Sequence, residues 1–220
     1  MLSGLQERIA RILAALPEAR EFALAGGAAL IAGGLVERET RDLDFFADRP
    51  GAVLDLLQVL EEALRQSGMQ VERQQALAGF ARLGVSDGTE STEVDLCYDV
   101  RVRPAETSAL GAVLAPEELA ADKMLAFFSR ALPRDLIDLH ALAQRFGFDR
   151  LCELAAEKDR GFNLPTGNPF GSFWPGPTVS VAGSWRPNLN IPPDPTLAVP
   201  RNRQAVARPR DLRKGRSFAD

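Results

Sequence analysis

Two aspartates one residue apart are the side chains best placed to do chemistry. Asp42 and Asp44 stand in the segment DLDFF (residues 42–46), which reads as a short strand. Alternate residues of a strand point to the same face, so both carboxylates face one way while Leu43 and Phe45 face the core. Two neighbouring carboxylates repel one another and raise each other's pKa unless a cation lies between them.

A divalent metal with oxygen ligands would relieve that repulsion. Mg²⁺ is commonly held by one or two carboxylates together with substrate phosphates. The pair therefore predicts a metal and phosphate site. The alternative is that both aspartates are exposed charges at a strand end, paired with Arg38 or Arg41.

A third carboxylate lies on a later strand. The segment STEVDLCYDV (91–100) alternates apolar and polar residues, so burying one set leaves Asp95 among the acids on the other face. If this strand lies beside 42–46, Asp95 completes a three-carboxylate cluster able to hold two metal ions. The alternative is a half-exposed antiparallel strand with an ordinary polar side. The residues expected in the core are Val94, Leu96 and Tyr98.

Two adjacent glycines precede these strands. Gly26 and Gly27 follow an expected strand at 21–25 and open an expected helix, AALIAGGL, which Gly33 and Gly34 close. Backbone N–H groups at a helix start that carry no Cβ suit a phosphate. A plain tight turn is the alternative, because the spacing matches neither the P-loop nor the dinucleotide fingerprint.

Further elements are needed to position these residues. Apolar periodicity predicts helices at 2–15 and 51–68 and strands at 69–77 and 79–87, with hairpin connections on either side of the second strand. After Pro104 the pattern changes to helices at 116–132, 134–147 and 148–158. We therefore expect an α+β fold: an α/β domain over residues 1–103, a helical domain over 104–163, and a Pro/Gly-rich, basic, disordered tail over 164–220.

Composition narrows the setting of the protein. The 220 residues carry a net charge of −4 and two cysteines, and no apolar run is long enough to span a bilayer. The amphipathic start does not read as a signal peptide, so we expect a cytoplasmic protein without disulfides and without membrane contact. From Gly161 onward there are eight Lys or Arg and three Asp or Glu, and a basic end of this kind is drawn to polyanions or is simply solvated.

The order of these motifs resembles a known family. GGAAL, RETRDLDFF, EVDLCYD and APEELAADKMLAFFSRALPRDLIDL follow one another as in the AbiEii/AbiGii-type nucleotidyltransferase toxins, within the DNA polymerase β-like nucleotidyltransferase superfamily. The resemblance spans roughly residues 21–162. It implies a nucleotidyltransferase-type mixed sheet with flanking helices.

The resemblance also implies roles for particular residues. Asp42, Asp44 and Asp95 would be catalytic and would bind Mg²⁺, with Mn²⁺ as an alternative. Lys123 would contact the NTP, and Asp138 would be a further functional acid. The residues implied in nucleotide binding are Gly26, Gly27, Lys123, Arg134 and Asp135. From spacing alone, Arg134 could equally pair with Asp138 one helical turn later.

The implied activity is transfer of NMP from an NTP such as ATP or GTP to an acceptor, with tRNA or another RNA expected, as the toxin of a toxin–antitoxin system. Nucleotidyl transfer needs in-line geometry, metal ions and cations on the triphosphate more than covalent help from the protein. A cognate antitoxin protein is the expected partner. Two alternatives remain open: a catalytically impaired nucleotide-binding module, and nucleotidylation of a protein hydroxyl.

Overall fold

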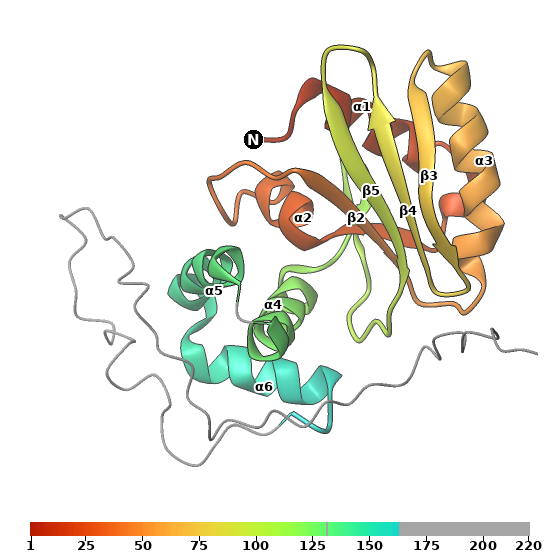
Figure 1. Cartoon of the computed structure of the whole chain (residues 1–220). Coiled ribbons are helices and arrows are strands. Elements are labelled where there is room, and N and C mark those ends of the chain that lie inside the picture. Colours follow the sequence, from red (N-terminus) through yellow and green to blue (C-terminus); the bar gives the residue numbers. More distant parts are fainter. Residues whose placement is uncertain (131, 163–220) are drawn as a thin grey trace, which may run out of the picture. The chain divides into compact units, whose positions relative to one another are not determined.

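Strands with one apolar and one polar face build a seven-stranded mixed sheet. The computed structural model describes residues 1–130 and 132–162, and the predicted tail at 164–220 lies outside them. The strand order is β3-β4-β5-β2-β1-β7-β6 (Figure 1). The strands are β1 (Phe22–Ala25), β2 (Asp42–Ala47), β3 (Gln70–Leu77), β4 (Phe80–Ser86), β5 (Ser91–Tyr98), β6 (Glu106–Ser108) and β7 (Gly111–Val113).

The centre of the sheet combines both strand directions. β2 runs antiparallel to β1 and parallel to β5, and β1 runs parallel to β7. The meander β3-β4-β5 and the pair β6-β7 are antiparallel. The expectation that the strand with Asp42 and Asp44 lies beside the strand with Asp95 is therefore confirmed, and the two strands run parallel.

Two amphipathic helices cover the apolar face of the sheet. α1 (Gly4–Ala14) starts at a capping box, in which the Ser3 hydroxyl accepts from the Gln6 amide and the Gln6 side chain accepts from the Ser3 amide. α1 buries Leu5, Ile9 and Leu13, and α3 (Ala52–Gln66) packs on β3, β4 and β5 and buries four of its leucines, Leu56, Leu57, Leu60 and Leu64. Each fully buried leucine stabilises the fold by about 1.5–3 kcal/mol.

Shorter helices and the segment after β7 complete the described part. α2 (Gly26–Ala32) packs on β2, and η1 (Pro17–Ala19) precedes β1. α4 (Pro116–Arg130), α5 (Pro133–Phe146) and α6 (Phe148–Lys158) pack on one another, and Figure 1 shows them together on the side of α2. Gly147, at φ +78°, makes the tight link between α5 and α6.

The predicted α+β class is confirmed, with two differences in detail. β6 and β7 were not predicted, because strands of three residues are too short to show an alternating pattern. Tyr98, expected in the core, is 39% exposed because it is the last residue of β5. Within the described ranges, no helix is long and apolar enough to cross a bilayer.

Candidate active site

The carboxylates meet on the face of the sheet that α1 and α3 leave open. In β2, Leu43, Phe45 and Ala47 are buried in alternation with more accessible neighbours, which puts Asp42 and Asp44 on the open face as predicted. The parallel register sets Asp44 directly opposite Asp95 of β5. Three acids from two strands therefore lie together.

A glycine makes room for the Asp44 carboxylate. β1 pairs with β2 so that Ala25 lies opposite Asp44, and the chain then turns into α2 at Gly26. Gly26 has φ +59°, and a Cβ added there would lie 1.9 Å from Asp44 Oδ2. Both the backbone conformation and the space demand glycine at this position.

Crowding changes the ionisation of Asp44. Burial, followed by the negative charges of Asp42 and Asp95, raises the pKa of Asp44 to about 6. The cations of Lys123 and Arg134 oppose that rise, which shows that both positive side chains lie within electrostatic reach of Asp44. A residue of the sheet is thus coupled to cations of α4 and α5.

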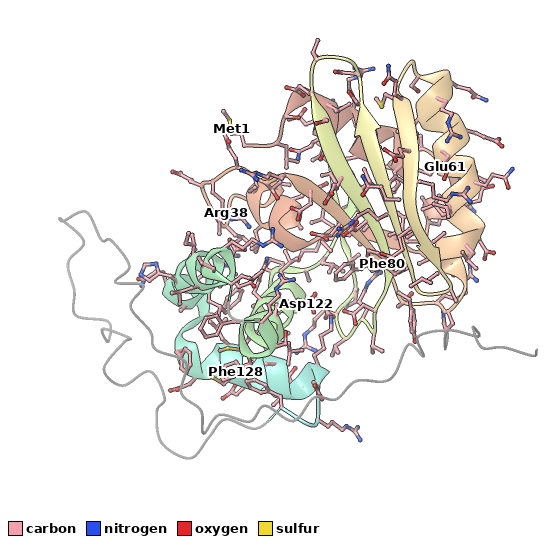
Figure 2. The ribbon with its side chains drawn as sticks, viewed as in Figure 1. Met1, Arg38, Glu61, Phe80, Asp122 and Phe128 are labelled. Atoms are coloured by element: carbon pink, nitrogen blue, oxygen red, sulfur yellow. The ribbon has the colours of Figure 1, made fainter. Side chains whose placement is uncertain are left out.

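The loop before β2 is tied to the helices by Arg38. Its Nε and Nη2 atoms donate to the two oxygens of Asp138, at 2.7 and 2.8 Å. Lys123 Nζ lies 2.9 Å from the same Asp138 carboxylate, whose side chain is fully buried. Arg38 (labelled in Figure 2) also approaches Gly27, where an added Cβ would lie 2.6 Å from Nη2.

A second buried acid extends this network. Asp135 accepts two hydrogen bonds from Arg130, at 2.8 and 3.0 Å, and lies 3.7 Å from Lys123 Nζ. Its side chain is also fully buried, and although burial opposes ionisation, the Arg130 hydrogen bonds and charge bring its pKa below the ordinary value. Asp135 and Asp138 are therefore buried acids that hold Arg130, Lys123 and Arg38 in place, whereas Asp42 and Arg134 remain partly accessible.

Arg134 projects toward the sheet. Its Nη1 lies 3.5 Å from Asp42 Oδ2, and half of its side chain is exposed. The alternative pairing with Asp138 is wrong, because Arg38 and Lys123 already occupy that carboxylate. Asp42 accepts a further hydrogen bond from the Thr40 hydroxyl at 2.7 Å. The suggested pairing of Asp42 and Asp44 with Arg38 is likewise wrong, because Arg38 pairs with Asp138.

Three arginines of this site were not predicted as functional: Arg38, Arg82 and Arg130. Arg82 of β4 lies opposite Asp95 and donates to both of its oxygens, from Nε at 2.7 Å and from Nη2 at 2.6 Å. The predicted hairpin between these strands was the signal that could have revealed it. Arg38 depends on a contact with Asp138, 100 positions away, for which the sequence holds no local pattern, whereas Arg130 pairs with Asp135 only five positions later, across the link between α4 and α5.

Two of the three predicted metal ligands, Asp42 and Asp44, are placed to bind a metal ion together. Within residues 1–130 and 132–162, no group of three or more His, Cys, Asp or Glu side chains is arranged to hold a metal ion. Asp95 is committed to Arg82, whereas Asp42 and Asp44 lie side by side on β2, and burial together with the charges of Asp42 and Asp95 raises the pKa of Asp44. A pair of carboxylates suffices for Mg²⁺ when substrate phosphates complete the shell.

Solved structures share this fold. JHP933 from Helicobacter pylori matches with 23% identity and a TM-score of 0.51, over 71% of this chain and 73% of its own. MenT4, a nucleotidyltransferase toxin from Mycobacterium tuberculosis H37Rv, matches with 22% identity and a TM-score of 0.54, over 73% and 66%. A comparison with curated proteins finds no match. The fold is thus of the kind that nucleotidyltransferase toxins have.

The family follows from the sequence as a whole. The model described as "Nucleotidyl transferase AbiEii toxin, Type IV TA system" matches residues 9–211. The chain belongs to this family of nucleotidyltransferase toxins, and the resemblance drawn from its motifs is confirmed.

Proposed function

We propose that this nucleotidyltransferase toxin uses Mg²⁺ to transfer a nucleoside monophosphate from an NTP to an RNA acceptor, with tRNA the expected one. The observation that carries the proposal is the convergence on Asp44. Two further carboxylates, Asp42 and Asp95, and two cations, Lys123 and Arg134, act on it from four elements: β2, β5, α4 and α5. Such a mixture of opposite charges suits a triphosphate that arrives with a metal ion.

The binding roles follow from accessibility. We expect the backbone N–H groups of Gly26 and Gly27, at the start of α2, to contact phosphate oxygens; the space of the absent Cβ atoms is filled by the Asp44 carboxylate and by Arg38. Arg134, half exposed beside Asp42, is the cation best placed to reach the phosphates, with Lys123 behind it. Asp135 and Asp138 are positioning residues that fix Lys123, Arg38 and Arg130.

The chemistry is a single displacement. An acceptor hydroxyl oxygen forms a bond to the α-phosphorus of the NTP, the bond from that phosphorus to the bridging oxygen breaks, and pyrophosphate leaves. Asp95 is the expected acceptor of the hydroxyl proton. Asp42 and Asp44 would hold Mg²⁺, which stabilises negative charge on the phosphate oxygens.

Charge supports the choice of a polyanionic acceptor. The last twenty residues contain seven Lys or Arg, and a cationic segment of this kind attracts nucleic acid through its phosphates. NTPs and tRNA are cytoplasmic, so we place the reaction there. The family is that of a type IV toxin–antitoxin system, which supports a cognate antitoxin as the protein partner.

The test is transfer of labelled nucleotide by the full chain. Each α-labelled NTP is incubated with Mg²⁺, total tRNA and the protein, and RNA and protein are then separated and counted. We expect label in RNA, a need for divalent metal, and at least about a 100-fold loss in the double variant Asp42→Ala/Asp44→Ala.

The controls separate the alternatives. Asp48→Ala removes an exposed carboxylate beyond the end of β2 and should leave transfer unchanged. Label in a protein fraction would replace the RNA acceptor with a protein hydroxyl. Equal labelling by the wild-type chain and the double variant would overturn the assignment of the site.

A further inference from the structure

The Arg82–Asp95 pair stands out among the ion pairs of the site. It uses both carboxylate oxygens of Asp95, which is the acid directly opposite Asp44, and it is formed across neighbouring antiparallel strands. The Asp95 side chain is only 8% exposed, and Arg82 donates to both of its oxygens. Bidentate pairs of this kind are among the stronger charge-assisted hydrogen bonds.

The pairing with Arg82 keeps Asp95 from acting as a third metal ligand beside Asp42 and Asp44. Asp42 and Asp44 remain beside each other, yet the three acids do not form a metal-binding group. A metal ion needs a carboxylate oxygen in direct contact at about 2.0–2.1 Å. Each Asp95 oxygen already accepts one hydrogen bond from Arg82, at 2.7 and 2.6 Å, and a dication beside the guanidinium would be repelled.

We propose that Arg82 is an internal competitor of the divalent cation for Asp95, so that the pair must open before Asp95 can join the site. The proposal rests on the metal site of the proposed function. It makes Arg82 a positioning residue that keeps Asp95 in place and neutralised in the free protein, and that sets how tightly the site holds a metal.

The structure offers Arg82 a second partner. Glu93 lies two residues before Asp95 on β5 and therefore points to the same face. Glu93 Oε2 is 3.6 Å from Arg82 Nη1, and its side chain is half exposed, so the guanidinium can transfer to it with little movement. The ring of Phe80 (labelled in Figure 2), with its centroid 5.7 Å from the guanidinium carbon, stabilises the cation on this face.

The test is metal binding without nucleotide. Mn²⁺ is titrated into the full chain, and free Mn²⁺ is followed by electron paramagnetic resonance. Arg82→Gln removes the competitor, so we expect its Kd for Mn²⁺ to fall about five- to tenfold below that of the wild-type chain. Arg82→Lys keeps the charge without the bidentate fork and should lie between them.

A closely matched control is available on the other face of the sheet. Arg73 of β3 donates to Glu61 at 2.6 Å, and the exposures of that pair, 46% and 6%, resemble the 37% and 8% of Arg82 and Asp95. Arg73→Gln therefore removes the same charge from a similar pair, and it should leave the Kd for Mn²⁺ within about twofold of wild type.

A double-mutant cycle shows whether the gain in Mn²⁺ affinity of Arg82→Gln depends on Asp95. Arg82→Gln should tighten Mn²⁺ binding in the wild-type background and have no such effect in an Asp95→Asn background. Glu93→Gln should weaken Mn²⁺ binding only when Arg82 is present. Circular dichroism melts confirm that each variant is folded at the titration temperature.

The outcomes separate this proposal from the proposed function. A Kd that Arg82→Gln does not lower, or a gain that survives Asp95→Asn, overturns the competitor role even if nucleotide transfer is found. Conversely, tighter Mn²⁺ binding by Arg82→Gln that requires Asp95 supports the role even if no nucleotide reaches an RNA.

Discussion

Gly26 and Gly34 have nearly the same backbone conformation in different surroundings. Both lie in the left-handed region, at φ +59° and +64°. A Cβ at Gly26 would collide with the Asp44 carboxylate, whereas nothing lies within 4 Å of a Cβ at Gly34. The pair thus separates the cost of backbone strain from the cost of displacing a site residue.

We expect Gly26→Ala and Gly34→Ala each to lose about 1–2 kcal/mol of stability through left-handed strain. Gly26→Ala should also displace Asp44 and lower nucleotide transfer at least about 100-fold, since misplacing a reacting group by an ångström has that effect. Urea unfolding and the labelling assay measure the two quantities. Equal activities for the two variants would show that Asp44 tolerates the displacement.

At the scale of elements, a buried lysine joins α6 to α4 and to the end of β5. Lys158 Nζ lies 2.8 Å from Asp99 and 2.9 Å from Glu118, and it also donates to Asp122. Burial would lower the pKa of Lys158, but the nearby carboxylates outweigh it and raise that pKa. Asp122 (labelled in Figure 2) precedes Lys123 in α4, so this cluster anchors the helix that carries a cation of the site.

Lys158→Met should therefore cost about 3–5 kcal/mol, because it leaves the buried Glu118 and the partly buried Asp122 without their cation. Arg150→Met on the same helix removes exposed pairs with Glu153 and Glu157 and should barely change the denaturation midpoint. Chemical denaturation with far-UV circular dichroism compares them. Similar midpoints for the two variants would mean that the Lys158 cluster contributes no net stability.

The helices and strands were largely predictable from the sequence, whereas the side-chain contacts between distant elements were not. Apolar alternation in DLDFF and the leucine spacing of 51–68 reflect local geometry, so β2 and α3 were expected within a few residues. The Arg38–Asp138 pair joins residues 100 positions apart, and no local pattern encodes it. Arg134 was weighed as a partner of Asp138 because i, i+4 spacing is visible in a sequence, whereas competition from Arg38 and Lys123 is not.

At the scale of the whole molecule, the ionised carboxylate of Asp44 lowers the stability of the fold at neutral pH. Asp44 has a pKa of about 6 in the fold against 3.8 for an unperturbed aspartate, so the folded protein retains a proton that the unfolded chain loses between these values. Bound protons are then more numerous in the folded state, and the free energy of unfolding falls as pH rises from about 4 to about 6. Above about pH 6, the free energy of unfolding no longer changes with pH through Asp44.

Asp44→Asn should remove that loss. We expect the variant to be more stable than wild type at pH 8, by on the order of 1–3 kcal/mol, and nearly equal to it at pH 4. Thermal unfolding across this pH range measures the difference, with Asp48→Asn as an exposed control. A difference that does not grow with pH would contradict the carboxylate repulsion inferred for the site.

The hundred residues between Arg38 and Asp138 have a consequence for synthesis. The ribosome adds about 5–20 residues per second, so roughly 5–20 seconds separate the production of these two partners. During that interval the nascent chain carries Gly26, Asp42 and Asp44 without Asp138. We therefore expect the growing toxin to be inert beside the ribosome that makes it, and to gain activity only after α5, which carries Asp138, emerges.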